Sequence, residues 1–125
     1  MKAAQTLAFN GTIAEHYTAR VRALNDALRR NLFTPTQNKV YYTAGVSALK
    51  DDDRFALLSE VQCFEDFNES NDPYGEHDFG AVKFHGEKYL FKIDYYDNNL
   101  EYHSPDKSDP KQTCRVLTIM RADEY

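Results

Sequence analysis

The chain of 125 residues has only two cysteines and no long run of apolar residues. Cys63 and Cys114 lie about fifty residues apart, which excludes a disulfide-dense scaffold and a zinc ribbon. The lack of a membrane-length apolar segment excludes a transmembrane helix, and the N-terminus has no continuous apolar core of a signal peptide. We therefore expect a cytoplasmic protein that has no membrane partner.

Familiar catalytic motifs are also missing from the chain. It contains no HExxH, no pair of CxxC motifs, no GxSxG and no glycine-rich phosphate loop. It has no internal repeat and no low-complexity tract. These absences leave the reaction unassigned, and we expect neither a cofactor nor a resident metal ion.

The chain is rich in large apolar side chains. Hydrophobic residues make up 42% of it and include nine tyrosines and eight phenylalanines, too many for a disordered chain. A length of 125 residues suits one compact domain, so we expect residues 1–125 to form a single domain.

Charge is distributed unevenly along the chain. Residues 1–50 sum to +5 and residues 51–125 to −10, and the pI is about 5.3. The acidic C-terminal part suits a surface that meets a basic partner. The low pI argues against direct binding of nucleic acid. Four arginines are expected on the solvent face of the first helix: Arg20, Arg22, Arg29 and Arg30.

The first predicted element is a long amphipathic helix. Thr12 and Glu15 form a capping box after the Asn10–Gly11 break, so we expect residues 1–11 to be a flexible tail or a short first turn. Thr34–Pro35 ends the helix. Apolar residues recur at helical spacing on one face: Ile13, Tyr17, Val21, Leu24, Leu28 and Leu32.

The remaining pattern predicts an α+β fold. A shorter second helix begins at Asp51 and reaches about Ser59, and residues 60–67 favour its continuation. Turn-forming residues fill 68–75, a hairpin turn spans 85–88, and a surface loop spans 98–111. Four strands are expected, at 39–43, 77–84, 89–95 and 115–120. We expect both helices to pack on an antiparallel sheet of about four strands.

Two segments collect polar and aromatic side chains, residues 71–80 (NDPYGEHDFG) and 92–97 (KIDYYD). The predicted hairpin places them on neighbouring strands. Because side chains alternate along a strand, Asp94 and Tyr96 should share one face and Tyr95 the opposite, core-facing one. We expect Asp94 and Tyr96 to be exposed or to face a groove.

One interpretation of these segments is catalytic. A histidine beside carboxylates can act as a general base, and carboxylates can hold a divalent cation that hydrolyses phosphodiesters. This predicts a small metal-dependent hydrolase or nuclease with Glu76, His77, Asp78 and Asp94 as its candidates. The polar side chains of such turns also accept hydrogen bonds from backbone N–H groups. A second interpretation is therefore a purely structural polar network that holds the turn to the sheet.

A third interpretation is a surface that binds a protein with a basic face. Tyrosine is favoured at interfaces, and an acidic surface mimics the phosphate charge that a nucleic-acid groove attracts. The expected acidic, tyrosine-rich face consists of Asp72, Tyr74, Glu76, Asp78, Asp94, Tyr96, Asp97, Glu101 and Asp106.

Several motifs resemble domain-of-unknown-function family 3768, a family of small bacterial proteins. They are NDPYGEHDFG (71–80), KIDYYD (92–97), SPDKSDPKQT (104–113) and RVLTIMRADEY (115–125), with VQCFEDFN (61–68), ALND (23–26) and TAGVSAL (43–49) in the same order. The family usually has tryptophan before KIDYYD, where this chain has Phe91. It also has a more apolar residue at the position of Arg121.

The resemblance implies a compact single-domain protein of bacteria, plasmids or phages, and it implies no reaction. It places the segments 76–78 and 94–97 within the family's shared pattern. By analogy with other small proteins of mobile elements, we expect an inhibitor of a host nucleic-acid-handling defence complex, of the anti-CRISPR or anti-restriction type.

Overall fold

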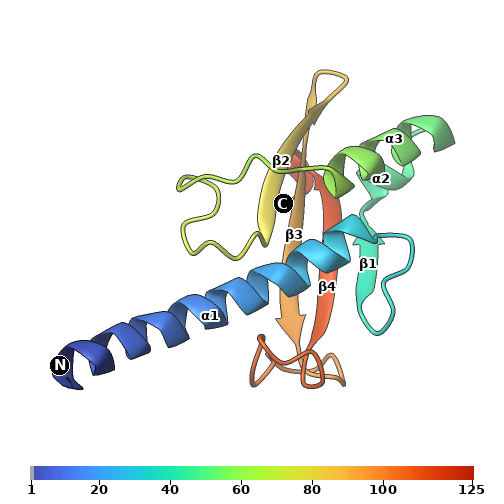
Figure 1. Cartoon of the computed structure of the whole chain (residues 1–125). Coiled ribbons are helices and arrows are strands. Elements are labelled where there is room, and N and C mark those ends of the chain that lie inside the picture. Colours follow the sequence, from blue (N-terminus) through green and yellow to red (C-terminus); the bar gives the residue numbers. More distant parts are fainter. Residues whose placement is uncertain (1) are drawn as a thin grey trace.

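The computed structural model describes residues 2–125, and it describes side chains for residues 13–125. Three α-helices, four strands and one 3-10 helix follow one another along residues 2–125 (Figure 1). Their bounds are α1 Lys2–Arg30, β1 Lys39–Tyr42, α2 Ala44–Ser47, α3 Asp51–Gln62, β2 Phe79–Phe84, β3 Glu87–Tyr96, β4 Cys114–Arg121 and η1 Ala122–Glu124.

The strands form one mixed sheet in the order β1-β4-β3-β2. β2 pairs with β3 and β3 with β4 in antiparallel register, whereas β1 pairs with β4 in parallel. The predicted α+β class with four strands is confirmed. The prediction of an all-antiparallel sheet is wrong, because β1 runs parallel to its neighbour β4. The parallel pair is possible because the long connection from β1 to β4 contains α3 and the whole β2–β3 hairpin.

The core lies between one face of the sheet and the helices α1 and α3. Alternate residues of β3 and β4 point into it, including Phe91 and Leu117, both fully buried. Leu28 of α1 and Leu57 of α3 meet them from the helical layer. This packing uses the apolar stripe that the sequence predicted for the second half of the first helix.

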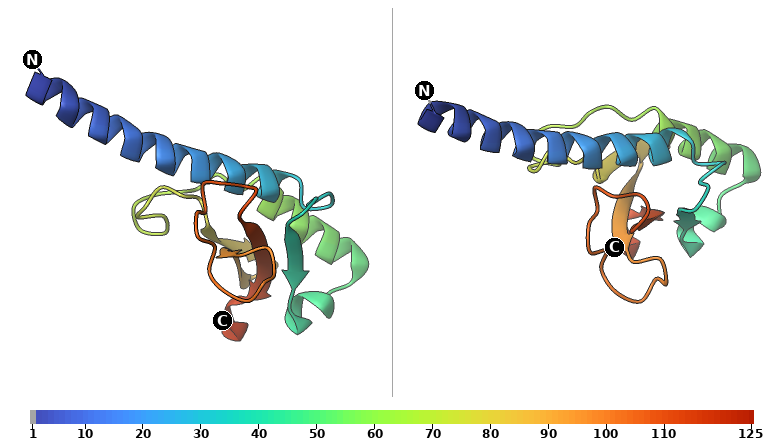
Figure 2. Two further views of the ribbon diagram at one scale, coloured as in Figure 1. Left: turned by 90° about the horizontal axis from the view of Figure 1, so that it is seen from below. Right: turned by 60° about the horizontal axis from the view of Figure 1, so that its bottom comes forward.

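Helix α1 continues past the edge of the sheet, so its N-terminal part projects from the body of the protein (Figure 2). Ile13 and Tyr17, predicted on the core-facing stripe, are therefore 49% and 40% exposed. The helix begins at Lys2 and passes through Asn10–Gly11, where the sequence predicted a break. A single glycine costs a helix only about 1 kcal/mol.

The predicted capping box is wrong, because α1 begins at Lys2 and Thr12 therefore lies within the helix. The flexible tail over residues 1–11 stays a prediction. Within residues 2–125, every helix is either too short or too polar to span a membrane.

Several boundaries differ from the prediction by a few residues. α3 continues past Ser59 as favoured, but only to Gln62, and residues 63–67 are not helical. β2 begins at Phe79 because the positive φ of His77, 59°, interrupts the extended backbone. The β2–β3 turn is shorter than expected. It consists of His85 and Gly86, whose φ angles of 50° and 80° match the two-residue turn that fits a twisted hairpin.

We predict that Gly80→Ala destabilises the fold. Gly80 is buried on the core face of β2, where a Cβ atom would lie 2.7 Å from Cζ of Phe91 and 2.8 Å from Cε1 of Phe64. Relieving this overlap should lower the free energy of unfolding by roughly 1–3 kcal/mol, measured by urea denaturation with circular dichroism. Ala81→Ser, on the exposed face of the same strand, is the control and should change stability by less than about 0.5 kcal/mol. Equal stability of the two variants would contradict the packing described.

Candidate functional site: a polar network beneath helix α1

The polar residues of segment 72–78 face the helical layer and not the solvent. Asp72 and Glu76 are only 9% exposed, and Asp78 is half-buried. The segment approaches α1 directly, because Nη1 of Arg22 donates to the carbonyl oxygen of Gly75 at 2.9 Å. The chemistry of this cluster therefore depends on its partners within the chain.

Asn25 of α1 connects the cluster with the sheet. It is fully buried, and its Nδ2 donates to the carbonyl oxygen of Glu76 at 3.0 Å and to Oη of Tyr95 at 2.8 Å. Its Oδ1 accepts a hydrogen bond from Nε of Arg115 at 2.7 Å. One amide thus joins α1 to β3, to β4 and to the segment before β2.

Tyr95 extends the network toward the carboxylates. Its Oη lies 3.0 Å from Oε1 of Glu76 and 3.3 Å from Oδ2 of Asp78, so the phenol donates to this pair. Burial, followed by the charge of Asp78, raises the pKa of Tyr95 above its usual value. The phenol therefore remains a donor at neutral pH.

Two cations accompany the carboxylates. Nζ of Lys107 lies 2.7 Å and 3.0 Å from the two carboxylate oxygens of Glu76, and it stands 5.0 Å from the ring centre of Tyr95. The guanidinium of Arg115 lies 5.3 Å from the same ring and donates through Nη2 to the carbonyl oxygen of Lys107. Glu76 is thus neutralised within the chain.

His77 is held between two carboxylates. Its Nδ1 lies 2.9 Å from Oδ1 of Asp26 on α1, and its Nε2 lies 3.6 Å from Oδ2 of Asp72. The ring stacks on Phe67 with centroids 3.8 Å apart. Because each ring nitrogen faces an acidic side chain, neither points freely toward a substrate in this arrangement.

The structure corrects the prediction that Arg29 lies on the solvent face of the first helix. Arg29 is 1% exposed, and its Nη1 donates to the carbonyl oxygens of Val61 and Gln62 at the C-terminal end of α3. A cation is favoured at this end of a helix, where carbonyls lack partners. Arg20 and Arg30 are exposed as predicted.

Asp94 does not belong to the cluster. Tyr95 is opposite Arg115 in the register and faces the core, so its neighbour Asp94 points to the other side of the sheet. There Oδ2 of Asp94 lies 3.0 Å from Nζ of Lys92. The alternation predicted for Asp94, Tyr95 and Tyr96 is therefore correct, but the structure does not bring Asp94 to Glu76, His77 and Asp78.

The rest of the predicted binding face divides into two groups. Asp97 and Asp106 accept loop N–H groups, from Glu101 and Ser108, each at 3.0 Å. Tyr74 is 82% exposed and Glu101 is exposed, and Tyr102, which was not part of the predicted face, is 73% exposed. Tyr96 is partly buried. The predicted face is therefore not one continuous acidic surface.

Five residues of the network were not predicted as site residues: Asn25, Asp26, Arg29, Lys107 and Arg115. The sequence carried one signal for them. Asn25 and Arg29 follow Val21 at intervals of four, so they interrupt a buried helical stripe with polar groups. A polar residue in such a stripe requires a buried partner, but its spacing does not identify that partner.

The acidic cluster does not have the geometry of a metal site. Across the residues that the structure describes, no group of three or more His, Cys, Asp or Glu side chains is arranged to hold a metal ion. The carboxylates of the cluster instead contact Lys107, Tyr95 and the ring of His77.

Fold and network together define a small α+β protein in which Glu76 and Arg29 pair with charged groups of the same chain. The family model for proteins of unknown function DUF3768 matches residues 42–124, and the chain belongs to this family, as its motifs indicated. Comparison with curated proteins and with solved structures found no match. Asn25, Asp26 and Arg29 lie outside the matched range.

We predict that Asp78→Asn increases stability and that the gain grows with pH. Burial and then the charge of Glu76 raise the pKa of Asp78 above its ordinary value of 3.8. The folded state therefore holds this proton more tightly than the unfolded state, and the wild type loses stability as pH rises from 3.8 through the raised pKa. The asparagine variant escapes this loss and still accepts the bond from Tyr95.

Urea denaturation from pH 3 to pH 7 measures this effect. Asp94→Asn is the matched control, because Asp94 lies on the other face beside Lys92 and should show no gain that increases with pH. A difference between Asp78→Asn and the wild type that stays constant over this range would contradict the prediction.

Proposed function

We propose that this protein is a non-catalytic binding protein that occupies a basic surface on a larger partner. Two loops would carry the contact, residues 65–76 and residues 97–109. The observation that carries the proposal is the exposure of Tyr74 and Tyr102, at 82% and 73%. Exposed tyrosines are favoured contact residues because they offer a large area and a polar tip at low entropy cost.

Hydrogen bonds within the loops support this role. Oδ1 of Asn68 accepts from the backbone N–H groups of Ser70 and Asn71, and the backbone N–H of Asp97 donates to the carbonyl oxygen of Tyr102 at 2.8 Å. Loops that are already ordered lose less entropy when they bind. The tyrosines are thus presented on a largely preformed surface.

The charge of the loops suggests the kind of partner. Residues 65–76 contain no lysine or arginine, and Glu65, Asp66 and Glu69 are exposed. In residues 97–109 Glu101 is exposed, while Lys107 is engaged by Glu76. An acidic surface with aromatic groups competes for a groove that attracts nucleic acid. We therefore propose, more specifically, that this protein inhibits a nucleic-acid-handling defence complex. It would be an inhibitor of the anti-restriction or anti-CRISPR type that a mobile element carries.

Affinity capture with charge-reversed variants tests the proposal. The double variant Glu69→Lys/Glu101→Lys and the double variant Tyr74→Ala/Tyr102→Ala should each weaken capture of the partner from a bacterial lysate roughly tenfold or more. Glu60→Lys, an exposed position on α3, is the charge control and should bind as the wild type does. Asp97 and Asp106 are unsuitable for reversal because their carboxylates order the loops. Capture that all variants retain equally would contradict the proposal.

The alternative function, a small metal-dependent hydrolase, is favoured by one contact, the 2.9 Å pairing of His77 with Asp26. A histidine oriented by a carboxylate can serve as a general base. A further variant, His77→Gln, distinguishes the two functions when it is compared with the charge-reversed variant. A hydrolase would lose turnover with His77→Gln and keep it with Glu69→Lys/Glu101→Lys. A binding protein would keep capture of its partner with His77→Gln and lose it with Glu69→Lys/Glu101→Lys.

A further inference from the structure

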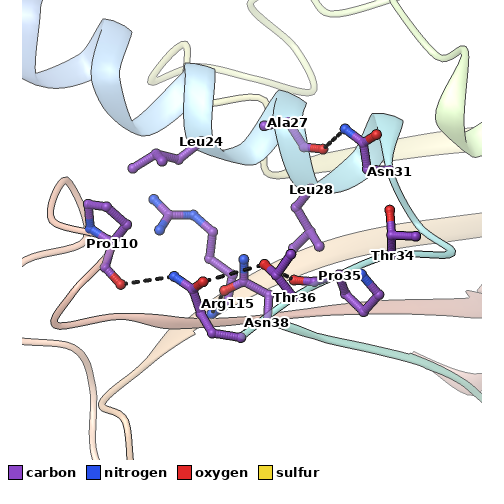
Figure 3. A pocket seen from close by; sticks show the side chains of 11 residues that line it. Leu24, Ala27, Leu28, Asn31, Thr34, Pro35, Thr36, Asn38, Pro110 and Arg115 are labelled. Atoms are coloured by element: carbon purple, nitrogen blue, oxygen red, sulfur yellow. Dashed lines mark hydrogen bonds between the residues drawn. The ribbon is translucent and has the colours of Figure 1, made fainter.

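A cavity of about 460 Å³ opens between the end of α1, the loop that follows it and the loop before β4. Figure 3 shows Leu24 and Leu28 of α1 above it, Pro35 at one end and Pro110 at the other, with the Arg115 guanidinium directed between Leu24 and Pro110. Its volume lies within the range of small-molecule sites. It is separate from the exposed tyrosines of the two acidic loops.

Arg115 is a buried cation without an ion-pair partner. It is 1% exposed, and within residues 13–125 no carboxylate forms an ion pair with it. Nε is bound by Asn25 and Nη2 by the carbonyl oxygen of Lys107, whereas Nη1 donates to none of the described residues. Buried charges in proteins are ordinarily paired, because burial of an unpaired charge is costly. Among the described residues lining the cavity, Arg115 alone is charged.

The walls of the cavity are held in place by hydrogen bonds. Oδ1 of Asn38 accepts from the backbone N–H of Arg115 at 2.8 Å, and Nε2 of Gln37 donates to the carbonyl oxygen of Pro110 at 3.1 Å. Thr36 lines the cavity with a φ of 58°, an unusual conformation for a β-branched residue. Strain of this kind is concentrated at functional positions.

We infer that this cavity binds an organic carboxylate that carries a short apolar chain. The carboxylate would pair with the guanidinium of Arg115, whose Nη1 is available as a donor. The apolar chain would lie against Leu24, Leu28 and the proline rings. Arginine suits this task because it stays charged at neutral pH and a charged donor forms a stronger hydrogen bond to a carboxylate than a neutral donor does.

Such a carboxylate has two sources, a free organic acid or the C-terminus of a peptide that ends in an apolar residue. Both present one anionic group on an apolar body. Titration of the ¹⁵N-labelled full chain with sodium hexanoate and with N-acetyl-glycyl-leucine separates them. The backbone N–H signals of Arg115 and Asn38 report binding at the cavity.

Two controls test the chemistry. Hexanamide matches hexanoate in shape but lacks the charge, and it should bind roughly tenfold more weakly or worse, because a charge-assisted hydrogen bond exceeds a neutral one. Ala27→Phe fills the mouth of the cavity from an exposed position on α1, so it should abolish the shifts without disturbing the buried network. Ala23→Phe, exposed one turn earlier and outside the cavity, should bind as the wild type does.

The outcomes are distinct. Saturable shifts with hexanoate or the dipeptide, lost in Ala27→Phe and kept in Ala23→Phe, support the inference, and the tighter of the two ligands identifies the source. Absence of saturable shifts with both ligands would overturn it. Equal binding of hexanamide and hexanoate would also overturn it, since recognition would then not involve the charge of Arg115.

Discussion

The buried amide of Asn25 is the interaction on which the arrangement of the site depends. It bonds to Glu76, Tyr95 and Arg115, and so it ties the helix to two central strands and to the segment that precedes β2. A buried amide left without these partners would cost far more than any one bond contributes. The helix, the segment and the sheet are therefore held in one relative position.

This junction explains why the acidic cluster faces inward. Once the backbone of Glu76 is bound to α1, its carboxylate reaches Lys107 and Tyr95, and the imidazole of His77 reaches Asp26. The groups with the most evident chemistry thus hold the fold together. The exposed surface of the loops and the cavity beside Arg115 remain open to other molecules.

The sequence predicted what depends on local pattern. Helical spacing located Val21 and Leu28 in the core, and alternation correctly separated Tyr95 from Asp94. It could not predict the burial of Asn25, because the partners that make this burial possible lie 51, 70 and 90 positions away in the chain. It also placed Ile13 and Tyr17 in the core, since periodicity does not reveal where the sheet ends beneath a helix.

A double-mutant cycle with Asn25→Ala and Tyr95→Phe tests the central claim most directly. If the amide and the phenol belong to one network, their effects on the free energy of unfolding will not add, and the coupling free energy from urea denaturation will be about 1 kcal/mol or more. Effects that add to within about 0.3–0.5 kcal/mol would show that the two groups stabilise the protein independently, and would contradict the claim.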